Sequence, residues 1–152
     1  MYIEQLLGNT TLIVVVISWA LSCIIKGIIE MIRYREIRWT RFTGSGGMPS
    51  SHSATVTSLC MCIGFSKGFD SVEFTICCVL AFVVMYDASG VRRAAGKHAS
   101  SINMIIEALG EKSPIKKEEK LKELLGHKPI EVLVGAMLGI IIAVVANIIV
   151  PM

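Results

Sequence analysis

Four long apolar runs dominate the chain and predict membrane-embedded helices. The first covers 12–32 with only Lys26 and Glu30 interrupting it, which suits the roughly 20 residues of a spanning helix. Three further runs cover 53–65, 72–85 and 130–150. The run over 53–65 is short for a rise of about 1.5 Å per residue, so we expect that helix to begin inside the protein and to rely on its neighbours.

A different pattern covers 94–125, where the apolar residues recur on one helical stripe. Gly110 and Pro114 break this pattern before a second, charged helix that we expect over 115–125. We predict that this amphipathic pair lies along the membrane interface on the cytoplasmic side. The apolar stripe of the first helix consists of Ile102, Ile105, Ile106 and Leu109.

Composition agrees with a membrane protein. Of the 152 residues, 53% are apolar and 18% are charged, and the mean hydropathy is +0.66, which argues against a water-soluble globule. We therefore predict an all-α protein: one membrane-embedded domain over 1–152, with about four spanning helices and the interfacial segment. The net charge of +3 is modest, and we expect no nucleic-acid partner.

The basic residues are distributed unevenly, which predicts the topology. Four Lys and Arg lie in 33–41, nine lie in 92–128, one is Lys67 and none precedes Lys26. By the positive-inside rule, the two basic segments face the cytoplasm, and both termini and the Lys67 turn face outward. We therefore expect a multi-pass protein of the cell (inner) membrane, in contact with membrane lipids.

Polar and ionisable residues gather at the helix ends that this topology places on the cytoplasmic side. Such residues are costly near a membrane and favour a functional site. For Lys26, an ion pair with Glu30 one helical turn later is an equal alternative. The candidate residues are Lys26, Arg33, Ser50, Ser51, His52, Asp87, Arg92, Arg93, His127 and Glu131.

The stretch 44–54 carries the strongest local signal. A glycine-rich loop passes through Pro49 into Ser50 and Ser51, and an apolar helix follows directly. Free backbone N–H groups and the helix dipole at such a start bind phosphate, and His52 stands beside them to hold or deliver a proton. An ordinary serine cap after a loop explains the serines but not the histidine.

These residues resemble the motifs of a known superfamily. Pro49-Ser50-Ser51-His52 is similar to the Pro-Ser-Gly-His motif of the type 2 phosphatidate phosphatases, which share a superfamily with acid phosphatases and vanadium haloperoxidases. With the stretches 86–93 and 125–132, the chain resembles a small divergent branch of that superfamily over nearly its whole length. The resemblance implies phosphate-ester hydrolysis without a metal or another cofactor.

The resemblance also implies a role for each residue. Lys26 and Arg33 keep the spacing of a phosphate-binding pair, and Arg92 corresponds to the arginine of the third motif. His127 and Glu131 correspond to the nucleophilic histidine and the acid that orients it, although the family has Asp there. His52 then protonates the leaving group, and Ser50 and Ser51 bind phosphate oxygens through backbone amides. Asp87 orients Arg92 or Arg93, or only ends a helix.

The resulting hypothesis is a phosphatase that forms a phosphohistidine and acts at the cytoplasmic face. The expected substrate is a lipid phosphate or a polyprenyl mono- or diphosphate. A non-catalytic phospholipid-binding or phosphate-binding protein and a transport protein are the alternatives. Gly135 and Gly139 also form a small-residue face, which favours either close packing within the chain or a homodimer.

Overall fold

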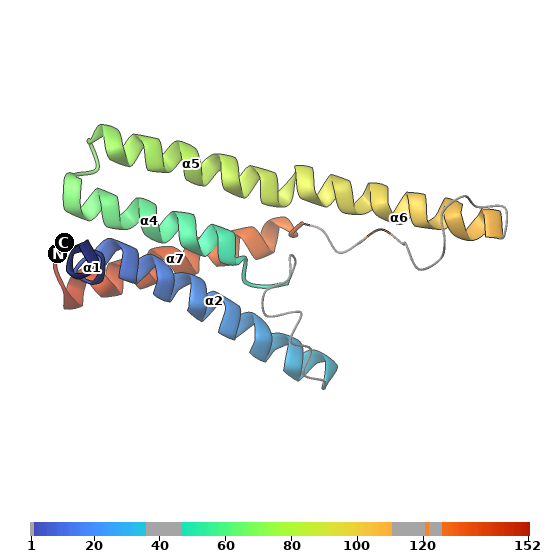
Figure 1. The fold of residues 1–152 in the computed structure, drawn as a ribbon, viewed down its shortest axis with the longest axis horizontal. Coiled ribbons are helices and arrows are strands. Elements are labelled where there is room, and N and C mark those ends of the chain that lie inside the picture. Colours follow the sequence, from blue (N-terminus) through green and yellow to red (C-terminus); the bar gives the residue numbers. More distant parts are fainter. Residues whose placement is uncertain (1, 36–46, 111–120, 122–125) are drawn as a thin grey trace.

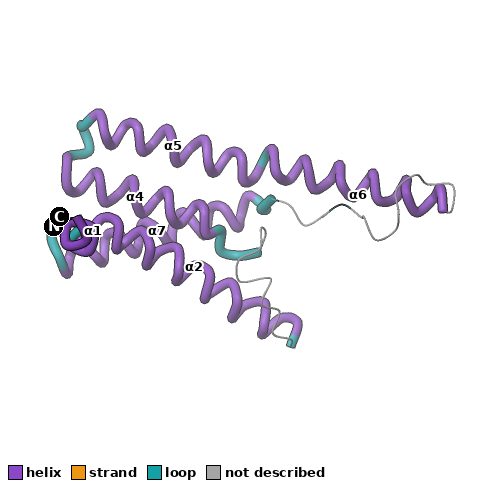
Figure 2. Tube along the Cα trace, viewed as in Figure 1, coloured by secondary structure: helices purple, strands orange, loops and turns teal. Residues whose placement is uncertain are grey.

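The computed structural model describes residues 2–35, 47–110, 121 and 126–152 (Figures 1 and 2). Within these residues every regular element is a helix, which confirms the all-α prediction. Each predicted apolar run corresponds to one helix. The helices are α1 (Tyr2–Leu7), α2 (Thr10–Tyr34), α4 (Ser51–Lys67), α5 (Val72–Ser89), α6 (Val91–Leu109) and α7 (Pro129–Ile149).

Helix α4 is the central helix of the bundle and packs against α2, α5 and α7. Figure 1 shows these helices side by side, with both chain termini at one end. Most of the buried residues of α4 are small or carry a hydroxyl, as at Ser53, Ala54 and Ser58, so its neighbours can approach closely. Its buried hydroxyls bond to nearby carbonyls: Thr57 Oγ1, for example, lies 2.8 Å from the Ser53 oxygen and 3.1 Å from the Ala136 oxygen.

Three stretches of the described helices are long and apolar enough to cross a membrane: Thr10–Arg33, Val72–Leu109 and Pro129–Ile149. Our expectation of about four spans therefore has to be refined. Helix α4 has 17 residues and lies among the other helices, in keeping with the short apolar run that predicted its reliance on neighbours. Its small and hydroxylated residues suit a position inside the protein better than contact with lipid.

The small-residue face of α7 is used within the chain. A Cβ atom at Gly135 would overlap the backbone oxygen of Ser50, and one at Gly139 would overlap Thr57 Oγ1 and the backbone oxygen of Ala54. The two glycines therefore let α7 touch the α4 backbone. This is the intramolecular alternative of the two that the sequence left open.

Helices α5 and α6 form one nearly continuous rod. Across Gly90 the helical ladder persists, because the Gly90 N–H donates to the Tyr86 oxygen (2.8 Å) and the Ala94 N–H donates to the Gly90 oxygen (2.9 Å). Helix α6 therefore runs on beyond the other helices in nearly the direction of α5 (Figure 1). The stretch Val72–Leu109, which includes α6, is as a whole long and apolar enough to cross a membrane, and the path of α6 along the membrane interface stays a prediction. Of the predicted second helix over 115–125, only Leu121 is described.

Candidate phosphate site

The candidate residues meet at the end of the bundle that lies away from the chain termini. The backbone N–H of Ser50, before α4, donates to the backbone oxygen of Glu131 on α7 (3.0 Å). The N–H of His127 donates to the oxygen of Ala88 near the end of α5 (2.9 Å). These two long-range bonds join the start of α4, the start of α7 and the α5–α6 junction.

His127 and Glu131 form the predicted pair. Nδ1 of His127 lies 3.0 Å from Oε2 of Glu131, and the imidazole is only 3% exposed. The same carboxylate oxygen also accepts the backbone N–H of Lys128 (3.2 Å), which fixes its position at the start of α7. A carboxylate at Nδ1 orients the ring and keeps the proton of a neutral imidazole on that nitrogen.

The surroundings of His127 favour its neutral form. Burial lowers the pKa of His127 below its ordinary value of 6.5, and the positive charge of Lys26 acts in the same direction. The hydrogen bond to Glu131, the negative charge of Glu131 and a hydrogen bond to the Gly47 backbone oppose this shift but do not reverse it. A buried imidazole that is neutral near pH 7 and oriented by a carboxylate has the properties of a nucleophile or a general base.

Lys26 is buried in the middle of α2, with 2% of its surface exposed. Its charge interacts with the carboxylates of Glu131 and Glu30 and with the imidazoles of His52 and His127. The sequence left open a pair with Glu30 in which the lysine reaches out to water, and the burial of Lys26 argues against that conformation. Lys26 is thus a buried cation that interacts with both histidines, His52 and His127, and with Glu30.

His52 and Arg92 lie on the exposed side of the same group. The ring of His52, in the first turn of α4, is within electrostatic range of Arg92, His127, Lys26 and Asp87. Nε of Arg92 donates to Oδ2 of Asp87 at 2.6 Å, so Asp87 orients Arg92, which was one of its two predicted roles. Because only Nε faces Asp87, the geometry leaves the terminal guanidinium nitrogens for a bidentate contact with an anion.

Ser50, which directly precedes α4, differs from its predicted role as a phosphate ligand. We expected the Ser50 amide to face phosphate, but it donates to Glu131, and the Ser50 side chain caps α4 by accepting the Ser53 N–H (3.3 Å). Ser50 is fully buried and joins α4 to α7. The Ser51 amide, in the first turn of α4, remains a predicted anion donor, and the neighbouring His52 amide is a further candidate, because the first four N–H groups of a helix have no partner within it.

Two of the predicted cations are not brought into this cluster. Arg33 is exposed on the last turn of α2, about 10 Å along the helix axis from Lys26, and Figure 1 shows this end of α2 diverging from α4 and α7. Arg93 is also exposed, and its backbone packs against Gly126. The described cluster therefore contains Lys26 and Arg92 as its cations.

Sequence reasoning missed Gly126, which positions His127. Its φ of +83° belongs to the left-handed region, and a Cβ there would overlap the backbone nitrogen of Arg93. Only glycine fits this close approach without strain. The available signal was a glycine directly before the candidate nucleophile.

Gly126→Ala is expected to separate His127 from the α5–α6 junction. We expect a loss of stability of about 1–3 kcal/mol, from backbone strain and overlap together. Thermal unfolding of the purified protein measures this loss, with Gly110→Ala as the comparison. Gly110 also has a positive φ (+54°), but a Cβ there would meet nothing within 4 Å, so a loss no larger than that of Gly110→Ala would contradict this role.

Comparison with known proteins identifies the family of the chain. The family model described as "Divergent PAP2 family" matches residues 7–142. The chain is also 38% identical over 151 residues to the "Uncharacterized membrane protein YuiD" of Bacillus subtilis (strain 168), covering 93% of this chain and 96% of that protein. No solved structure matches. The chain is thus a multi-pass membrane protein that belongs to the Divergent PAP2 family.

Proposed function

We propose that this protein is a phosphatase that cleaves a lipid phosphate or a polyprenyl mono- or diphosphate through a phosphohistidine at His127. The observation that carries the proposal is the buried His127–Glu131 pair beside Lys26, at the point where α4 and α7 begin. A purely structural role would account for the contact between His127 and Glu131. It would not account for a neutral, oriented imidazole with two cations and two helix N-termini around it.

In the first step, the lone pair of His127 Nε2 attacks phosphorus, and the bond from phosphorus to the leaving oxygen breaks. His52 gives its proton to that oxygen, so the alcohol or phosphate product leaves in protonated form. In the second step, neutral His52 takes a proton from water while the water oxygen attacks phosphorus. The phosphorus–nitrogen bond breaks, inorganic phosphate leaves, and both histidines return to their starting states.

The surrounding charges stabilise the transferring group. Arg92, oriented by Asp87, binds two of its equatorial oxygens, and the amides of Ser51 and His52 with the helix dipole bind the same charge. Lys26 stabilises the charge from inside the bundle. Burial and the charges of Arg92 and Lys26 lower the pKa of His52 in the protein alone. A phosphate dianion among these cations opposes that shift and favours the protonated form of His52, which the first step needs.

The site lies at the cytoplasmic face in this proposal, because the positive-inside rule places the basic segments there. The expected partner is the phosphate head group of a lipid or prenyl substrate approached from that side, and the chemistry assigned to His127 and His52 requires neither a metal nor another cofactor.

The proposal is tested by phosphate release from purified protein in detergent, with and without a chelator. The panel contains phosphatidate, phosphatidylglycerophosphate, polyprenyl mono- and diphosphates, and soluble phosphate esters. We expect release from at least one amphiphilic substrate in both conditions. Release from no substrate, or release that the chelator abolishes, would contradict the proposal.

The pH profile gives an independent prediction. The pKa of His127 lies below its ordinary value, so neutral nucleophile persists as the pH falls through 6.5 and disappears only at lower pH. We therefore expect kcat/KM to fall on the acidic side of its pH profile only below pH 6.5. Glu131→Gln removes an interaction that raises this pKa, so it should move the limb to still lower pH and reduce kcat.

Glu73→Gln is the matched control for Glu131→Gln, because Glu73 also lies in the first turn of a helix, α5, at the opposite end of the bundle. We expect the control to keep the wild-type profile. An acidic limb above pH 6.5, or a limb that Glu131→Gln moves upward, would contradict the assigned environment of His127.

A non-catalytic phosphate-binding protein is the second candidate, and one observation favours it. Arg33 lies outside the cluster and the Ser50 amide is occupied, so the described residues provide fewer phosphate contacts than the family motifs imply. In that case the protein binds amphiphilic phosphates without releasing phosphate, and Arg92→Ala weakens the binding.

A further inference from the structure

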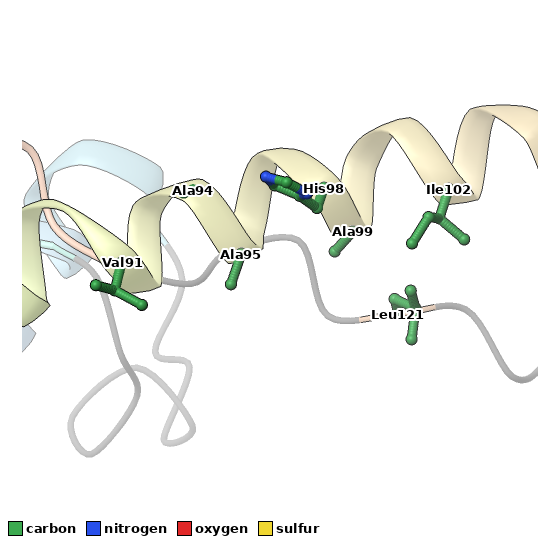
Figure 3. A pocket seen from close by; sticks show the side chains of 7 residues that line it. All are labelled: Val91, Ala94, Ala95, His98, Ala99, Ile102 and Leu121. Carbon is green, nitrogen blue, oxygen red and sulfur yellow. The ribbon is translucent and has the colours of Figure 1, made fainter.

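An apolar groove runs along α6 next to the phosphate site. Its volume is about 570 Å³, within the range of small-molecule sites. In Figure 3, the side chains of Val91, Ala95, Ala99 and Ile102 point to the side of the helix where Leu121 lies. Ala94 and His98 also line the groove, and among the lining residues that the structure describes His98 is the ionisable one.

The groove begins where the phosphate site ends. Val91 directly precedes Arg92, whose guanidinium Asp87 orients at the site. From Val91 to Ile102 the groove extends about 16 Å along the helix, from eleven residues at about 1.5 Å each. A molecule with its phosphate at Arg92 and a hydrocarbon chain along α6 matches both the charge of the site and the apolar lining.

The far wall of the groove is fixed by specific hydrogen bonds. Asn103 is buried, its Nδ2 donates to the Leu121 oxygen (2.8 Å), and its Oδ1 accepts the Leu121 N–H (3.0 Å). This two-bond contact holds the backbone of Leu121 beside α6. Between Val91 and Ile102 the groove is lined by His98 and by three alanines, whose short side chains leave space beside Leu121.

We propose that this groove binds the single hydrocarbon chain of an amphiphilic phosphate whose head group occupies the phosphate site. The proposal rests on the proposed function for the role of that head group. The groove lies along one face of α6, and its volume of about 570 Å³ suits one hydrocarbon chain. The preferred substrate class is therefore a single-chain alkyl or prenyl phosphate and not a two-chain lipid.

The test varies chain length and groove volume together. In lipid nanodiscs, KM is measured for butyl, octyl and dodecyl phosphate, and for phosphatidate. For the wild type, each methylene placed in the groove should lower KM by up to about fourfold. Ala95→Leu and Ala94→Leu fill the groove at two exposed positions, and each should raise KM for dodecyl phosphate at least tenfold and that for butyl phosphate by a much smaller factor.

Ala108→Leu is the matched control, since Ala108 is exposed on the same helix and outside the lining. We expect it to retain the wild-type dependence on chain length. If the groove variants and the control behave alike, or if phosphatidate is preferred to dodecyl phosphate, the proposal is wrong. It is also wrong if filling the groove lowers the unfolding temperature without changing the chain-length dependence, because the groove then belongs to the packing of the chain itself.

A binding measurement separates this inference from the phosphatase proposal. Dodecylphosphonate and butylphosphonate, which cannot be hydrolysed at the carbon–phosphorus bond, are titrated into the His127→Ala protein. Tighter binding of the longer probe that Ala95→Leu removes supports the groove even if no substrate is hydrolysed. Equal affinities for the two probes would overturn the groove whatever the catalytic result.

Discussion

Replacing His127 by alanine is expected to reduce phosphate release by at least about 10⁴-fold, because loss of a covalent nucleophile removes the whole two-step route. The fold should survive, since the backbone N–H of His127 still bonds to the Ala88 oxygen. Steady-state phosphate release with the best substrate of the panel, together with thermal unfolding of the same preparation, measures both effects.

Added imidazole provides the control for His127→Ala. A small imidazole that enters the vacated space can accept the phosphoryl group and restore part of the activity, whereas it cannot repair a collapsed helix junction. Lys67→Ala, at the far end of α4, should release phosphate at the wild-type rate. If the His127→Ala protein releases phosphate at the wild-type rate, His127 is not the nucleophile.

Gly135→Ala is expected to have the largest structural effect. The added methyl group would overlap the backbone oxygen of Ser50, and a backbone atom cannot turn aside as a side chain does. Helices α4 and α7 must therefore separate where Ser50 bonds to Glu131. We expect a loss of stability of about 3 kcal/mol, at the upper end for overpacking. A displacement of about 1 Å between His52 and His127 lowers kcat by a further 10²-fold or so.

Gly8→Ala is a suitable comparison for Gly135→Ala, because a Cβ at Gly8 would meet only the backbone oxygens of Glu4 and Gln5, in the preceding turn of its own segment. Thermal unfolding and phosphate release of the two variants are measured side by side. If Gly135→Ala unfolds at the same temperature as Gly8→Ala and keeps full activity, the glycine is not what sets the distance between α4 and α7.

The helices and the central pair could be predicted from the sequence because both depend on local spacing. The run over 130–150 became α7, at Pro129–Ile149, since an uninterrupted apolar run has few other stable forms in a membrane. His127 and Glu131 are four residues apart, so an α-helix that begins between them brings the side chains together. The small-residue face of α7 likewise predicted where another helix would touch.

The features of the site that the sequence did not predict depend on tertiary packing, which the pattern of residues along the chain does not show. The Ser50 amide was expected at a phosphate, but the approach of α7 gives it the Glu131 oxygen as a partner. Arg33 has the spacing of a second phosphate ligand, yet the straight course of α2 carries it away from α4. The passage of α5 into α6 likewise depends on the backbone at Gly90, which continues the helical ladder.

Trapping of the phosphoryl group tests the central claim most directly. His52→Ala protein is incubated with p-nitrophenyl phosphate, whose leaving group needs no proton donor, so the first step proceeds while the water attack that His52 assists is slowed. The reaction is quenched in base, where phosphohistidine survives, and the labelled peptide is sequenced by mass spectrometry. We predict a phosphoryl group on His127 and none in the His52→Ala/His127→Ala protein. Phosphate release without a label, or a label on another residue, would contradict the mechanism.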